Sequence, residues 1–358
     1  MMVADEFEML KYVYFSSNAW FLALTIYMPV LDKVVEEEYV DQKEPLEIPG
    51  CKAVRVEDVV DPMLDRSNQQ YLEYVRMGMD IPKCNGILLN TWEDLQHKTL
   101  EALRDEELLG QLFRVPLYPV GPLMRPTKPL DQRSGELFLW LDNQPNESVI
   151  YVSFGNGGTL SIEQMVELAW GLELSRQRFI WVVRPPTRKT RDGSFFTVES
   201  GEVNSMASYF PEGFLDRIQD VGLVIQDWAP QVDILNHPSI GGFLSHCGWN
   251  SMLESISNGV PMIAWPLYVE RRMNAALLTE ELGVAMRSNI LASEGVVGRE
   301  EIEMTIRTIM GDKEGTKIRK RVKELKCSAE RTLSEGGSSS NALSLVAKEC
   351  ELSWKSHR

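Results

Sequence analysis

Residues 149–154 read VIYVSF, and a glycine-rich turn, GNGG, follows at 155–158. Further short apolar runs come downstream, each separated from the next by a stretch with helical spacing. These runs are FIWVV (179–183), LVIQDW (223–228), GGFLSH (241–246) and VPMIAW (260–265). Apolar strands that alternate with helices predict a parallel sheet covered on both faces, and therefore a doubly wound α/β domain. Such sheets bind ligands beyond the carboxyl ends of their strands, so a site is expected in the turns after these runs.

The rest of the chain divides around a segment rich in proline and glycine. Upstream of it, residues 6–40 and 61–79 have the pattern of helices, and GILLN (86–90) has that of a buried strand. Downstream, helices are expected at 161–177, 211–219, 231–236, 249–257 and 270–282, followed by charged helices after Gly298. We therefore expect four parts: a first lobe (1–121), a linker (122–135), the doubly wound domain (136–336) and a last helix that packs back on the first lobe (337–358).

Composition excludes several classes of function. The chain has 358 residues and a formal net charge of −15, without a basic stripe, which argues against a nucleic-acid-binding protein. No apolar stretch is long enough to span a membrane, and the start of the chain lacks the positive charge of a signal peptide. Five cysteines without a CxxC pair favour a reducing compartment and give no metal-finger spacing. These observations predict a cytoplasmic protein without a membrane span or a metal site.

The strongest pattern covers residues 228–271, WAPQVDILNHPSIGGFLSHCGWNSMLESISNGVPMIAWPLYVER. Its opening WAPQ, its centre HCGWNS and its closing PLYVE together resemble the signature box of plant family 1 UDP-glycosyltransferases. The turn YVSFGNGGTL, the PVGPL segment and the carboxyl-terminal helices extend the resemblance over the whole chain, and they are similar to the branch that acts on hydroquinone and other small phenols.

This resemblance implies the fold and the activity. The fold would be of the GT-B type, with two Rossmann-like lobes, of which the first is incomplete here. The activity would be that of a UDP-glucose-dependent O-glucosyltransferase that inverts the anomeric carbon and acts on small phenolic acceptors. It would need no metal and no cofactor besides the UDP-sugar substrate, and we expect a monomer.

The same box predicts a donor site. Its residues follow the expected strands or open the expected helices: Asn156, Trp228, Ala229, Gln231, His246, Trp249, Asn250, Ser251, Glu254, Glu270 and Arg271. The Trp228 indole would stack on uracil, with the Ala229 backbone at the base edge. Gln231 and Glu254 would bind the ribose hydroxyls.

A diphosphate is expected where His246 ends a strand and the next helix begins, because free N–H groups and the positive end of the helix dipole meet there. Trp249, Asn250 and Ser251 open that helix. His246 is therefore interpreted as a phosphate ligand and not a base, although a lone histidine at a strand end is more often a core residue. The neighbouring Cys247 suggests a nucleophile, an interpretation we reject because no second histidine, besides the phosphate ligand His246, lies nearby in the sequence to activate it.

Two residues depart from the family pattern. The resemblance places Glu270 at the sugar hydroxyls, next to a position where glucosyltransferases of the family usually carry glutamine. Arg271 stands there instead, with donors only and a permanent charge. It either pairs with the carboxylate of a hexuronate donor or extends into solvent and leaves glucose as the donor sugar. Asn156 replaces the usual serine or threonine of the glycine turn.

No catalytic residue can be assigned. The family uses a histidine near its amino terminus as the base, oriented by an aspartate. None of the four histidines here (His97, His237, His246 and His357) has the expected surroundings, and the base and its aspartate are expected upstream of Met1. The alternative to an active enzyme is thus an inactive, truncated UDP-sugar-binding remnant. A nicotinamide-dependent oxidoreductase is a poorer interpretation, because the glycine turn lacks the GxGxxG pattern.

Overall fold

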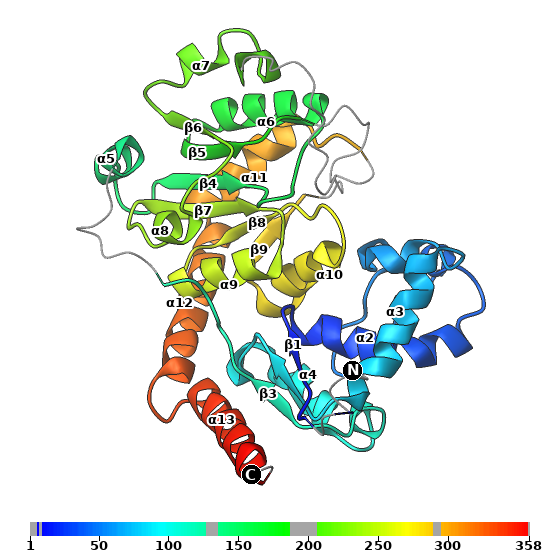
Figure 1. Ribbon diagram of the computed structural model, residues 1–358. Coiled ribbons are helices and arrows are strands. Elements are labelled where there is room, and N and C mark those ends of the chain that lie inside the picture. The colour runs from blue at the N-terminus through cyan, green and yellow to red at the C-terminus, as the bar shows by residue number, and fades with distance from the viewer. Residues whose placement is uncertain (1–5, 7–8, 127–134, 187–205, 289–294, 357–358) are drawn as a thin grey trace. The chain divides into compact units, whose positions relative to one another are not determined.

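The computed structural model describes residues 6, 9–126, 135–186, 206–288 and 295–356 (Figure 1). The chain forms two compact units. The first unit combines residues 1–123 with 325–358, and the second is the continuous segment 124–324. The boundary therefore falls at 324, inside a long helix, and not at the expected 336. The expected linker, 122–135, lies partly outside the described residues.

The first unit contains a three-stranded parallel sheet in the order β1-β2-β3. Its strands are β1 (Tyr12–Phe15), β2 (Gly86–Leu89) and β3 (Leu117–Pro119). Its helices are α2 (Ala19–Val34), α3 (Gln69–Asp80), α4 (Glu93–Arg104) and α13 (Ser338–Ser356), with 3-10 turns at Tyr39–Asp41, Val56–Asp58, Asp61–Leu64, Ile81–Lys83 and Leu109–Gln111. The strand expected at 86–90 is confirmed.

The expectation of one helix over residues 6–40 is wrong. Strand β1 occupies the start of that stretch, and α2 begins only after Asn18, whose side chain accepts a hydrogen bond from the Phe21 N–H. Such a side-chain cap satisfies a backbone donor that the first helical turn leaves open. The apolar run of β1 therefore enters the sheet, and the helix starts where asparagine can cap it.

Helix α13 packs on the sheet of its own unit. The Glu349 carboxylate accepts hydrogen bonds from the hydroxyls of Tyr12 in β1 and Tyr118 in β3, at 2.6 Å each. Upstream, the buried Trp92 indole N–H donates to Ser328 at the carboxyl-terminal end of α12 (Lys313–Leu333). Helix α13 and the carboxyl-terminal end of α12 are thus part of the first unit.

The second unit is a doubly wound domain around a six-stranded parallel sheet, in the order β6-β5-β4-β7-β8-β9 (Figure 1). The strands are β4 (Val149–Ser153), β5 (Arg178–Val183), β6 (Gly222–Gln226), β7 (Ile240–Ser245), β8 (Met262–Ala264) and β9 (Ala285–Arg287). The helices are α5 (Glu136–Asp142), α6 (Ile162–Ser175), α7 (Phe214–Arg217), α8 (Gln231–Leu235), α9 (Trp249–Asn258), α10 (Arg271–Ala276), continued by a π-helical stretch (Leu277–Leu282), and α11 (Arg299–Gly311), with a 3-10 turn at Met206–Tyr209. All five strands expected in this domain are confirmed.

The core of this domain lies between the sheet and helices α6 and α11. Val152 and Leu244 point into it from β4 and β7, together with apolar residues of both helices. Successive side chains of a strand alternate between faces. Tyr151 and Phe243 accordingly belong to the opposite face, where their rings stack with centroids 5.1 Å apart. Two packed faces hold the carboxyl ends of the strands along one edge, and that edge carries the site.

Candidate functional site

The site begins at the carboxyl ends of the central strands β4 and β7. Each strand ends on a buried serine whose hydroxyl accepts a hydrogen bond from the backbone two residues on: Gly155 N–H to Ser153 (3.3 Å) and Cys247 N–H to Ser245 (3.4 Å). Gly155 and Cys247 both adopt positive φ, +71° and +63°. The two turns therefore bend sharply at the same edge of neighbouring strands.

The His246 ring is enclosed between these turns. A Cβ atom on Gly155 would lie 2.6 Å from its Cε1 and Nε2 atoms, and a Cβ atom on Gly248 would lie 2.6 Å from Nε2. The side chain is 5% exposed, and its Nδ1 atom is buried without a hydrogen-bond partner among the described residues. Both glycines are thus required by close approach to the imidazole.

Electrostatics keep this imidazole neutral in the free protein. Burial lowers the pKa of His246 well below its usual value, and the positive charge of Arg271 lowers the pKa further. A neutral, buried ring nitrogen without a partner is costly to maintain. An incoming anion beside the ring would favour its protonated form and remove that cost.

Helix α9 starts next to His246 without a side-chain cap. Its N-cap is Gly248, which provides no side-chain hydrogen bond to the first turn. Trp249 and Ser251 are buried, whereas Asn250 is exposed. The uncapped N–H groups and the helix dipole make this a place for an anion.

A second cluster joins helices α8 and α9. Gln231 Nε2 donates to the Ser251 hydroxyl at 2.9 Å and to Glu254 Oε2 at 2.6 Å. Burial raises the pKa of Glu254, although the Gln231 hydrogen bond and the charge of Arg125 oppose the rise. Both hydrogens of the Gln231 amide nitrogen are used, so its amide oxygen and the second Glu254 oxygen remain for a ligand's hydroxyl groups.

An exposed indole lies after β6. Trp228 is 62% exposed, in contrast to the core residue Trp181 at 1%. Asp227, just before it, has φ +65°, which turns the chain out of the strand. The carbonyl of the buried Ala229 already accepts from the Gln231 N–H at 2.9 Å. An aromatic face left open to solvent at the edge of a binding sheet is suited to stacking on a planar ring.

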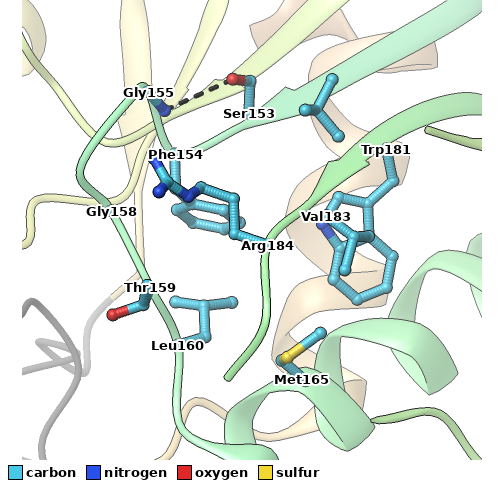
Figure 2. Close-up of a pocket in the computed structure, with 11 residues that line it drawn as sticks. Ser153, Phe154, Gly155, Gly158, Thr159, Leu160, Met165, Trp181, Val183 and Arg184 are labelled. Carbon is cyan, nitrogen blue, oxygen red and sulfur yellow. Dashed lines mark hydrogen bonds between the residues drawn. The ribbon is translucent and has the colours of Figure 1, made fainter. Parts of the chain in front are cut away.

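Sequence reasoning missed Arg184, which comes directly after β5. Figure 2 shows its side chain reaching across Phe154 toward the turn at Gly155, along the rim of a pocket lined by Thr159, Leu160 and Trp181. No ion pair involves Arg184 among the described residues. The signal available in the sequence was an arginine immediately after an apolar strand, at the edge where anions are expected.

At the far side of the site, Glu270 occupies the N-cap position of helix α10 without a side-chain hydrogen bond to it, and Arg271 is the first residue of the helix. The Arg271 guanidinium carbon lies 3.7 Å from the centre of the Tyr268 ring, and its Nη1 atom is buried without a partner among the described residues. The Arg271 residue is half-buried, and its guanidinium lies on the Tyr268 ring. Asn156, in the turn after β4, is exposed.

The histidines outside this edge have other surroundings. His97 is exposed, 3.8 Å from Glu101. His237 precedes β7, at the opposite edge of the sheet, where its ring bonds to Ser239 (2.8 Å) and Asp142 (3.0 Å). His357 lies outside the described residues. Of the residues described, His246 is the histidine at the carboxyl edge of the large sheet.

The Cys247 thiol is buried next to His246. Burial raises the pKa of the Cys247 thiol to about 12, so it is not a thiolate at neutral pH. All five cysteines are free. The described segments contain no cluster of three or more histidine, cysteine, aspartate or glutamate side chains that could hold a metal ion, and no helix with the length and apolar composition of a membrane span.

Comparisons with known proteins agree with this geometry. The family described as UDP-glucoronosyl and UDP-glucosyl transferase matches residues 114–317. Anthocyanidin 3-O-glucosyltransferase 5 of Manihot esculenta is 63% identical over 99% of this chain and 73% of its own length, and the hydroquinone glucosyltransferase of Rauvolfia serpentina is 44% identical over 98% and 73%. Among solved structures, TcCGT1 in complex with UDP superposes with a TM-score of 0.92 at 54% identity, over 98% of this chain and 74% of that one.

Proposed function

This chain belongs to the plant family 1 UDP-glycosyltransferases, of the GT-B fold, and we propose that it uses UDP-glucose to glucosylate the hydroxyl group of a small phenolic acceptor. The relatives named for hydroquinone and anthocyanidin support the acceptor class, since both are phenols. Both are also named glucosyltransferases, which supports glucose as the sugar. Inversion at the anomeric carbon and independence from metal belong to the same proposal.

The observation that carries the proposal is the buried His246 ring at the uncapped start of α9. Its Nδ1 atom has no partner among the described residues, and Gly248, the N-cap of α9, offers no side-chain hydrogen bond to the first turn of the helix. An acidic protein has no general attraction for a diphosphate, so local dipoles have to supply it. The proposal assigns the diphosphate of UDP to this point, with the exposed Asn156 amide as a further donor.

The remaining donor contacts follow from the same edge. Trp228 would stack on uracil with the Ala229 N–H at the base edge, and the free oxygens of Gln231 and Glu254 would accept hydrogen bonds from the two ribose hydroxyls. Glu270 would bind sugar hydroxyl groups. These assignments place the base, the ribose, the diphosphate and the sugar in order along the carboxyl edge, from β6 to β8.

Titration calorimetry of the 358-residue chain with UDP in EDTA tests the donor site. We expect measurable binding without metal, and binding weaker by about fivefold to 150-fold in Trp228→Ala, because base stacking contributes about 1–3 kcal/mol. Trp354, on α13, is 63% exposed, close to the 62% of Trp228, so Trp354→Ala is a matched control that should leave UDP affinity unchanged. Absence of binding heat at millimolar UDP would contradict the proposed donor site.

A specific observation favours a second candidate function, that of a UDP-sugar-binding protein without turnover. The phenol proton has to be taken up by a base, and a positioned base typically contributes about 10²- to 10⁴-fold to the rate. Of the described histidines, His97 is exposed, His237 lies at the wrong edge and His246 is assigned to the diphosphate.

Chromatographic assay of glucoside formed from UDP-glucose and hydroquinone separates the two functions. UDP binding without glucoside supports the binding protein. Glucoside above background supports the enzyme, and His97→Ala then identifies or excludes the exposed histidine as its base, with His237→Ala as the comparison.

A further inference from the structure

Arg271 is a cation of the second unit without an ion pair among the described residues. Its guanidinium stacks on the Tyr268 ring at 3.7 Å, and its Nη1 atom is buried and has no hydrogen-bond acceptor in the same part of the chain. A ring face attracts the charge but accepts none of the in-plane N–H bonds. Burial of a charged Nη1 group without an anion beside it is unfavourable. The side chain is therefore prepared for an anion supplied by a ligand.

The position of Arg271 indicates which anion. Strands β7 and β8 are parallel neighbours in register, with Ser245 opposite Ala264. His246 follows the first strand and Arg271 follows the second after a short turn, so both side chains belong to one edge. The charge of Arg271 reaches the His246 ring, where it lowers the pKa of that imidazole. Helix α10 also contacts this edge directly, because the Asn274 side-chain amide donates to the Cys247 carbonyl at 2.9 Å.

We propose that Arg271 binds the β-phosphate of UDP, and that it thereby makes this chain distinguish nucleoside diphosphates from monophosphates. This inference rests on the proposed function, because it takes the diphosphate to lie between His246 and α9. In this arrangement the α-phosphate would lie at the start of α9, and the β-phosphate would lie one bridging oxygen further along the donor, toward β8. A guanidinium there forms charge-assisted, two-pronged hydrogen bonds with phosphate oxygens.

Calorimetry with UDP and UMP on the full chain tests this assignment. Arg271→Gln should weaken UDP at least tenfold and change UMP affinity less than about threefold, because UMP lacks the β-phosphate. Arg271→Lys keeps the charge and should retain most of the preference for UDP, which guards against a folding defect. Arg307→Gln is the matched control: it removes one positive charge from an exposed arginine on α11 and should alter neither affinity.

Other results would overturn the inference. If the ratio of UDP affinity to UMP affinity is the same in Arg271→Gln as in the unmodified chain, Arg271 does not bind the β-phosphate, although the donor site itself is still supported. A loss seen with UDP-glucuronate but not with UDP would assign the arginine to a sugar carboxylate instead. If the unmodified chain does not bind UDP, the proposed function fails first, and this inference fails with it.

Discussion

Gly155→Ala is the substitution that tests most directly how the site is built. Gly155 has φ +71°, and a methyl group there would lie 2.6 Å from two atoms of the His246 ring. The ring cannot retreat toward Gly248, where the available space is equally small. The added methyl group must therefore displace the imidazole or distort the turn after β4.

The magnitude follows from two contributions. A residue with a side chain costs about 1–2 kcal/mol in the left-handed region. Overpacking against the ring adds about 1–3 kcal/mol, so Gly155→Ala should lose roughly 2–5 kcal/mol in total. Gly283→Ala isolates the first contribution, because Gly283 has φ +65° and no described atom lies within 4 Å of the place that its methyl group would take. That variant should lose only about 1–2 kcal/mol.

Urea unfolding, followed by tryptophan fluorescence, measures these losses, and calorimetry measures UDP affinity in the same variants. Combining Gly155→Ala with His246→Ala should recover about 1–3 kcal/mol, since residues in contact couple by that amount. Gly155→Ala should also weaken UDP at least tenfold, while Gly283→Ala should not. If both single glycine variants lose the same stability and keep the same UDP affinity, the ring is not held as described.

Three further outcomes are expected. Glu254→Gln should weaken UDP about tenfold or more but 2′,3′-dideoxy-UDP hardly at all in calorimetry, because the lost charge-assisted bonds involve the ribose hydroxyls. Burial lowers the pKa of His246 in the folded chain, so below about pH 6.5 the unfolded chain binds a proton that the folded chain does not. The free energy of unfolding should therefore decrease as the pH is lowered through this range. Urea titrations of His246→Gln should lack this part of the pH dependence. Glu349→Gln should lose about 1–2 kcal/mol of stability at pH 7. The hydrogen bonds from Tyr118 and Tyr12 lower the pKa of Glu349, so their stabilisation should be present above about pH 4.5 and disappear as the pH falls. Urea titrations at pH 3.5 and 7 would measure this difference.

The large sheet could be predicted from sequence because each of its central strands is an apolar run that ends at a turn. Strand β4 was expected at 149–154 and runs over Val149–Ser153, and β7 was expected at 241–246 and runs over Ile240–Ser245. The shorter edge strand β9, Ala285–Arg287, was not predicted. Three residues, of which two are only partly buried, carry no detectable alternation.

Strand β1 was missed for a different reason. Its run, Tyr12–Phe15, is followed within a few residues by the apolar face of α2, so periodicity alone merged the two. The boundary signal was the capping residue Asn18, which is weaker in a sequence than an apolar run.

In the functional site, the signature box at 228–271 indicated that Gln231 and Glu254 act together, and their side chains are hydrogen-bonded. The stacking of Arg271 on Tyr268 could not be predicted, because it depends on how the turn after β8 folds back.

The order in which a ribosome delivers this chain has a consequence for the first unit. That unit is built from two segments separated by the whole of residues 124–324. During synthesis the hydrogen bond from the buried Trp92 indole N–H cannot form before Ser328 has been added to the chain. The hydrogen bonds from the Tyr12 and Tyr118 hydroxyls cannot form before Glu349 has been added. The second unit is continuous, so it can finish folding while translation proceeds. The first unit is completed only when α13 has left the ribosome, and until then the apolar side chains of β3 lack the cover that Ala342 and Val346 provide.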